Sequence, residues 1–317
     1  MAVIRPNILN NATALRKYCD GVNLLKHEFT GPTTAALGIP GATNKVSTYD
    51  LFVIWHHQTM MTFTPPNQMD RNAAHRGPVF LPWHRFMLRQ LELNLSRVLK
   101  DTTFGLPYWD WAADGNLPSN QQAKSKLWTD AGIGGSGSPV TNGPFAFNAS
   151  DPKSFRVLVE SGPNADLRQV NRGLRRQLGS ASSLPKKTHT AKVLTVTPYD
   201  APPWTASSST GFRNQVEGWT PNPPGLHNLV HVWVGGDMSP ASSPNDPVFF
   251  LNHCNVDRIW EAWMQKHGRV YVPDQSASND LKGHRINDPL ASLLSAPTTP
   301  AAVLDVTSQY TYDSLDV

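Results

Sequence analysis

The residues best suited to chemistry in this chain are its histidines, of which the 317-residue sequence holds 11. His227 and His231 stand in the run HNLVH. On a helix, residues four apart lie on one face about one turn from each other, so both imidazoles can reach one metal ion. The same spacing also occurs between ordinary core or surface histidines. The pair alone is therefore a weak indication of a metal site.

The residues around this pair narrow the chemistry. Position 228 is Asn, whereas a zinc metalloprotease carries a Glu there as its general base. The sequence therefore disfavours a metalloprotease. His253 follows in the apolar run DPVFFLNHC, where a neutral imidazole is either a metal ligand or a core histidine with its own hydrogen-bond partners.

A second group of histidines lies upstream and consists of His56, His75 and His84. Three imidazoles without a carboxylate or a thiolate can hold zinc, copper or another borderline metal. Two such groups in one chain predict a paired metal site inside a four-helix bundle, where facing helices supply the ligands.

The segments that must position these histidines have a helical pattern of apolar residues. We expect helices over residues 47–61, 83–100, 226–233 and 246–266. Pro82 stands just before the second, Pro223 and Pro224 precede the third, and Asp246 is a candidate N-cap of the fourth. Residues 112–152 and 179–210 have the composition of long loops. The prediction is a mainly α fold, a four-helix bundle with irregular loops and little β, in a single domain over residues 1–317.

Composition excludes several other classes. Charged residues make up 16% of the chain, and its basic residues are scattered, so the net charge of +4 predicts no nucleic-acid partner. The sequence has no apolar run of membrane-spanning length and no signal peptide, which predicts a cytoplasmic location. Cys19 and Cys254 are too few for a disulfide framework, and we expect free thiols.

Several runs together resemble one known family, the tyrosinases, which are type-3 copper proteins, and within it the bacterial branch. They are AHRGPVFLPWHR, PYWDW, GFRNQVEGW, LHNLVHVWVGG and SPNDPVFFLNHCNVDRIW. The similarity extends from about Tyr49 to Trp263, and the run Tyr310-Thr311-Tyr312 resembles the tyrosine motif that closes the family's catalytic domain. The first 46 residues match poorly.

The resemblance implies two copper ions, Cu-A and Cu-B, with three histidine ligands each. The Cu-A ligands would be His56, His75 and His84, and the Cu-B ligands His227, His231 and His253. It also implies an enzyme that uses O2 to oxidise a small phenolic or aminophenolic substrate to an o-quinone or o-quinone imine, with ortho-hydroxylation of monophenols as a further activity. In bacterial members a small helper protein often supplies copper and export, and such a copper chaperone would explain export without a signal peptide.

The resemblance assigns roles to neighbouring residues as well. Glu217 and Asn228 match positions that hold a water able to take the phenol proton, which is needed because a phenol is mostly neutral at pH 7. The alternative is that Glu217 pairs with Arg213 and that Asn228 caps or packs. His57 points about 100° away from His56 on a helix and is not expected to be a ligand. Ala73 replaces the cysteine that fungal and plant relatives cross-link to a histidine, so no thioether bridge is expected.

Phe249 and Asn252 are the predicted substrate-binding residues. Phe249 resembles an aromatic residue that packs against the substrate ring, although it equally fits the core. Asn252 stands where most relatives have a second histidine, and its amide cannot titrate. This departure and the divergent segment 24–46 favour a specialised o-aminophenol or o-diphenol oxidase of secondary metabolism over an enzyme for free tyrosine.

Two further aspartates and the rival functions complete the predictions. Asp257 is placed to hydrogen-bond a ligand imidazole, or else to pair with Arg258 or a neighbouring arginine. Asp110 is expected to be structural, and Cys254 to lie outside the site. A reversible O2 carrier of the hemocyanin kind uses similar chemistry and remains the alternative. A mononuclear zinc hydrolase is a third possibility, distinguished by its metal content.

Overall fold

The computed structural model describes residues 2–220 and 225–317 and is mainly helical, as the sequence predicts. Its α-helices are α1 Ala12–Lys26, α2 Thr48–Met60, α3 Phe80–Leu99, α4 Trp111–Gly115, α5 Ser119–Gln122, α6 Lys187–Val193, α7 Phe212–Glu217, α8 Leu226–Val234 and α9 Val248–His267. The strands are β1 Val3–Arg5, β2 Val157–Ser161, β3 Leu167–Arg172 and β4 Tyr310–Tyr312. The two antiparallel strands β2 and β3 form one small sheet, and β1 pairs in parallel with β4 in the other, Val3 opposite Tyr310 and Arg5 opposite Tyr312.

Helices α2 and α3 form where expected, with one difference. Ser47 caps α2 by accepting a hydrogen bond from the amide of Asp50 at 3.0 Å. Helix α3 begins at Phe80, earlier than predicted, so that Pro82 lies inside it. A proline is tolerated there because amides of the first helical turn have no carbonyl partner in the helix.

Helices α8 and α9 also follow the predicted ranges. Helix α8 ends at Val234 and is followed by Gly235, whose φ of +64° is readily adopted by glycine. The N-cap of α9 is Pro247 and not Asp246 as predicted, although the Asp246 carboxylate accepts a hydrogen bond from the amide of Val248, the first residue of the helix, at 3.0 Å. Pro223 and Pro224 lie outside the described residues.

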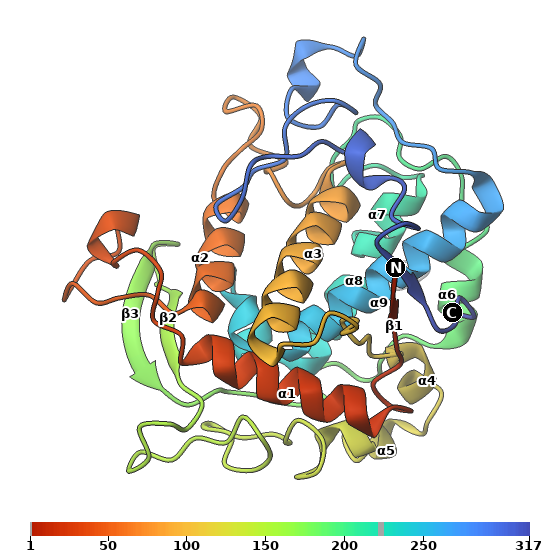
Figure 1. The fold of residues 1–317 in the computed structure, drawn as a ribbon. Coiled ribbons are helices and arrows are strands. Elements are labelled where there is room, and N and C mark those ends of the chain that lie inside the picture. The colour runs from red at the N-terminus through yellow and green to blue at the C-terminus, as the bar shows by residue number, and fades with distance from the viewer. Residues whose placement is uncertain (1, 221–224) are drawn as a thin grey trace.

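The four helices α2, α3, α8 and α9 carry five of the six candidate ligands and enclose an aromatic core. Figure 1 shows α2 and α3 side by side, with α1 running past them and the β2–β3 hairpin beside α2. Trp55 of α2 packs edge-on against Trp83 and Phe86 of α3, at ring distances of 5.4 Å. Phe52 packs in the same way on Phe250 of α9. The bundle therefore rests on interlocking aromatic rings.

Three elements differ from the loops that the sequence predicts. Helix α6 lies within residues 179–210, and α5 and most of α4 lie within residues 112–152. These helices have only four to seven residues, which is too short for a clear apolar period. Asp110 has the structural role expected of it, because its side chain caps α4 by accepting from the amide of Ala113.

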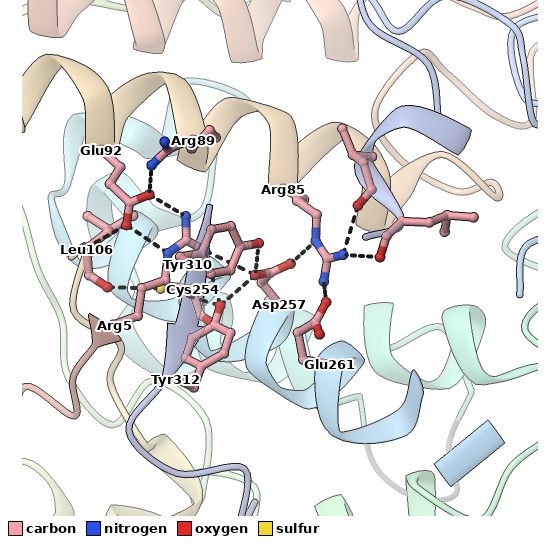
Figure 2. Close-up of polar contacts among 12 residues, drawn as sticks. Arg5, Arg85, Arg89, Glu92, Leu106, Cys254, Asp257, Glu261, Tyr310 and Tyr312 are labelled. Carbon is pink, nitrogen blue, oxygen red and sulfur yellow. Dashed lines mark hydrogen bonds and ion pairs between the residues drawn. The ribbon is translucent and has the colours of Figure 1, made fainter. Parts of the chain in front are cut away.

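A buried network of charges joins α3 and α9 to the paired strands β1 and β4, and so ties both chain ends to the bundle (Figure 2). Asp257 accepts hydrogen bonds from Arg85 at 2.6 Å and Arg5 at 3.1 Å, and from Tyr310 at 2.7 Å and Tyr312 at 2.5 Å. The alternative prediction, a pair with Arg258 or a neighbouring arginine, is confirmed for the neighbouring arginines Arg85 and Arg5. The two tyrosine partners were not predicted. The expectation that Asp257 bonds a ligand imidazole is wrong, because arginines and tyrosines already surround its carboxylate.

The pairing of β1 with β4 brings the two ends of the described chain together. The single-domain organisation stays a prediction. Among the described residues, no helix combines the length and the apolar character needed to cross a membrane.

We expect Asp257→Asn to lower the free energy of unfolding by about 3 kcal/mol, because the change removes the charge shared by two buried guanidinium groups. Chemical denaturation measures this loss. Asp20→Asn is the matched control, since Asp20 is 57% exposed and 3.9 Å from Arg16, and it should leave stability unchanged. Equal stability of the two variants would contradict a supporting role for the network.

Candidate metal centre

The first group of histidines comes together from two helices and a loop. His56 lies on α2, His84 on α3, and His75 on the segment between them. One nitrogen of each ring lies within 4.8 Å of the others, and all three side chains are buried. The segments predicted to supply these ligands therefore do meet.

The second group comes from α8 and α9. His227 and His231 project from successive turns of α8, with ring centres 4.4 Å apart, and His253 of α9 completes the group. Their nearest nitrogens also lie within 4.8 Å of one another. Among the described residues, these two triads are the groups of possible metal ligands that meet this spacing.

Backbone carbonyls orient most of these rings. The Nδ1 atoms of His56, His84 and His231 lie 2.7–2.8 Å from the carbonyls of Ala241, Phe80 and Met238, respectively. A neutral imidazole that donates from Nδ1 presents Nε2 as a lone pair, which is the form that binds metal. The carbonyls thus favour the tautomer with its proton on Nδ1, and they orient each ring so that Nε2 is left to bind a metal ion.

The free nitrogens of these three rings fit a metal ion. The Nε2 atoms of His56, His84 and His231 are buried and have no hydrogen-bond partner within the described part of the chain. Buried polar atoms without a partner are costly, whereas three converging imidazole nitrogens are a common donor set for copper or zinc. Both triads therefore have the donor chemistry of a metal site.

Burial keeps the six imidazoles neutral. It lowers the pKa of His56 to about 3 and that of His231 to about 4. It also lowers the pKa values of the other four, and neighbouring imidazoles add to this effect. Each ring is consequently in its metal-binding state at neutral pH.

The two triads face each other. The rings of His84 and His253 stack with centres 4.1 Å apart, and the Nε2 atoms of His227 and His253 are 3.1 Å apart. This contact joins α3 and α8 to α9, so the triads belong to one centre rather than to two separate sites.

A cavity of about 360 Å³ gives access to this centre. Its walls include four of the candidate ligands, namely His56, His75, His227 and His231. The size is sufficient for a small aromatic molecule. Its other lining residues are Met60, Arg76, Trp219, Asn228, Val232, Ser239, Pro240 and Ser243.

The loop that carries His75 depends on two residues that sequence reasoning missed. The side chain of Asn72 accepts hydrogen bonds from the amides of Ala74 and His75, at 3.0 and 2.7 Å. Arg76 follows with φ +60°, a conformation that costs a residue with a side chain about 1–3 kcal/mol. Its amide donates to Glu217 at 2.7 Å, which stabilises the turn. Asparagine is common in turns, so Asn72 was a local signal from which a turn before His75 could have been predicted, whereas the contact of Arg76 with Glu217 had no such signal.

Glu217 and Asn228 both lie next to His227. The Nδ1 atom of His227 is 3.2 Å from the carbonyl of Glu217 and 3.1 Å from Oδ1 of Asn228. The Glu217 carboxylate is fully buried and also binds Arg213 at 3.0 Å. Burial raises the pKa of Glu217, while Arg213, the amide of Arg76 and the side chain of Trp219 oppose that rise. Asn228 lines the cavity, whereas Glu217 is not among its lining residues.

Phe249 and Asn252 are not among the residues that line the cavity. Phe249 is buried between the triads, with ring centres 4.2 Å from His253 and 4.9 Å from His56. This placement favours the core interpretation that the sequence left open. Asn252 is fully buried, and its amide has no hydrogen-bond partner among the described residues. Their roles in substrate binding stay predictions.

Neither cysteine is near enough to serve the centre. Cys254 Sγ lies 3.4 Å from the carbonyl of Leu106 and 3.8 Å from the hydroxyl of Tyr312, in the network of Figure 2. Both thiols are free and buried, and burial raises their pKa values to about 12. His57 belongs to neither triad.

Comparison with known proteins decides the family. The common central domain of tyrosinase matches residues 46–266. The chain belongs to the tyrosinase family. It is 39% identical over 272 residues to a tyrosinase of Streptomyces antibioticus, covering 84% of this chain and 89% of that protein. It is 38% identical over 288 residues to grixazone synthase of Streptomyces griseus, covering 84% and 90%.

The fold is also that of a solved relative. The structure of a polyphenol oxidase from Thermothelomyces thermophila aligns with a TM-score of 0.71 and 24% sequence identity, covering 99% of this chain and 89% of that one. This tyrosinase-family chain is therefore a copper-dependent phenol oxidase, and its two histidine triads form a type-3 dicopper centre. The prediction of family, fold, cofactor and enzyme class is confirmed.

We expect the loaded protein to hold two copper ions per chain. Either His56→Ala or His253→Ala should reduce this number to about one, because each variant removes a ligand from one triad and leaves the other triad complete. Elemental analysis of folded protein measures the ratio. His57→Gln is the matched control and should retain two copper ions.

Chelation of copper should lower the melting temperature of the wild type, since a metal bound by the folded state stabilises it. One zinc ion per chain would contradict the assignment.

Proposed function

We propose that this tyrosinase-family enzyme is specialised for o-diphenols or o-aminophenols. The observation that carries the proposal is the cavity, which reaches four ligands from both triads and is large enough for one aromatic ring. Such access suits an oxidase better than an O2 carrier. The departure at Asn252 supports a substrate other than free tyrosine. The relatives at 38–39% identity bear two different activity names, so overall similarity favours neither substrate.

The overall reaction balances as two diphenols and one O2 giving two o-quinones and two water molecules. Each diphenol loses two electrons and two protons, and O2 accepts four of each. Copper, when bound, supplies O2 binding and electron transfer. The protein supplies neutral imidazoles, a shaped cavity and groups that can take protons.

We further propose that Asn228 and Glu217 serve the hydroxylation of monophenols. Asn228 lines the cavity, and its side-chain oxygen lies 3.1 Å from Nδ1 of His227, next to the backbone carbonyl of Glu217. The Glu217 carboxylate accepts a hydrogen bond at 2.7 Å from the amide of Arg76, which also lines the cavity. A water bound by the Asn228 amide would take the phenol proton and pass it toward the Glu217 carboxylate. Arg213 also bonds Asp200 at 2.8 Å, so this guanidinium keeps one partner when Glu217 is changed.

Delivery of copper by a helper protein is proposed as well, together with a location in the cytoplasm or export beside that protein. Five of the six ligands are buried, which supports controlled loading through the cavity. Full loading of the purified copper-free chain by copper salt alone, with normal activity, would contradict the need for a helper.

The substrate proposal is tested by comparing tyrosine, catechol and 3-amino-4-hydroxybenzoate, with O2 uptake as the readout for the copper-loaded protein. We expect rapid turnover of catechol or the aminophenol and slow turnover of tyrosine. Rapid hydroxylation of tyrosine without a lag would contradict specialisation. Two bound coppers with no O2 uptake on any substrate would favour the carrier.

Glu217→Gln should reduce kcat/KM for a monophenol by roughly a hundredfold relative to kcat/KM for catechol, which is the lower end of a general-base effect. The ratio of the two substrates is the measurement, because a general loss of folding or copper affects both. Glu28→Gln is the matched control, since Glu28 pairs with Arg97 outside the cavity. An unchanged ratio would refute the proton role.

A further inference from the structure

The cavity that leads to the dicopper centre has a single charged residue in its described lining, and that residue is basic. Among its described lining residues, Arg76 is the one with a permanent charge, and none is acidic. The others are neutral histidines, apolar residues, serines, Asn228 and Trp219. A ligand entering this cavity therefore meets one fixed positive charge.

The backbone of Arg76 is fixed by its neighbours, and its side chain lies against Trp219. Arg76 follows His75 directly, and its backbone adopts a φ of +60° while its amide donates to the buried carboxylate of Glu217. Its guanidinium lies 5.3 Å from the ring centre of Trp219, a distance typical of a cation–π contact. Trp219 is 39% exposed and lines the same cavity.

The guanidinium of Arg76 is also free to bind an anionic ligand. Two other arginines near the centre form ion pairs with buried carboxylates. Arg213 pairs with Asp200 and Glu217. Arg85 pairs with Asp257 and Glu261. Arg76, in contrast, is exposed, and its guanidinium forms no ion pair with a carboxylate of the described residues. A guanidinium of this kind binds a planar carboxylate through two parallel hydrogen bonds.

We propose that Arg76, supported by Trp219, binds a carboxylate carried by the ring of the phenolic substrate. The inference rests on the proposed function and deepens it, because it names hydroxylated or aminated benzoates as the preferred substrate class. The substrate's hydroxyl faces the histidines, while its carboxylate lies toward Arg76 at the wall. Arg76 thereby acts on specificity and leaves the chemistry of the centre unchanged.

The test compares 3,4-dihydroxybenzoate with 3,4-dihydroxybenzamide, which share a catechol ring and differ in charge. We expect Arg76→Gln to raise KM for the acid by roughly five- to tenfold and to leave KM for the amide and both kcat values within about twofold. Arg76→Lys should recover part of the loss, because it restores the charge without the fork. Arg16→Gln removes an exposed charge from α1 and should change nothing.

A binding measurement separates this inference from the proposed function. Calorimetry with benzoate and benzamide on the copper-loaded protein should show that Arg76→Gln weakens benzoate binding by a similar factor and spares benzamide. If the wild type oxidises neither catechol yet Arg76→Gln still weakens benzoate binding, the proposed function fails and the carboxylate site stands. If both catechols are oxidised and Arg76→Gln affects acid and amide equally, or affects neither, the site is refuted.

Discussion

The constraint on which this structure depends is the burial of six neutral imidazoles that face one another. An imidazolium ion in this place would be both desolvated and next to other rings, and the pKa of His56 accordingly falls to about 3. Backbone carbonyls at Ala241, Phe80 and Met238 hold three of the rings by Nδ1. The orientation of the donor nitrogens is thus set by the turns and helix ends around the centre.

Charged residues stabilise the helices that carry the imidazoles. Arg85 of α3 and Asp257 of α9 form a buried pair at 2.6 Å, and Arg5 of β1 joins the same carboxylate. On the other side Arg176 binds Asp246 at 2.6 Å, directly before α9. The small number of charged residues in the composition does not reveal these ion pairs. Many of the charged side chains are buried and paired with one another. The basic pI of about 9.1 consequently says little about a macromolecular partner.

Most of the centre could be predicted from the sequence, because each ligand lies in a short segment whose own residue pattern is recognisable. The spacing of His227 and His231 is that of one helix face. The segments around His56, His84 and His253 have the apolar period of a helix, and the structure has helices at all these places. The partner of Asp257 was left open, because Arg5 and Tyr312 are distant in sequence and meet only through the pairing of β1 with β4. The turn at Asn72 and Arg76 depends on a contact with Glu217 from α7, which no local pattern shows. The short helices α5 and α6 were not predicted for a different reason, because four and seven residues are too few to show an apolar period.

The central claim is that each histidine triad holds one copper ion within a single centre. Diffraction from crystals of the copper-loaded protein, with anomalous data collected at the copper absorption edge, tests it most directly. The account predicts two anomalous peaks, one among His56, His75 and His84 and one among His227, His231 and His253. A single peak, or a metal bound outside these triads, would contradict it.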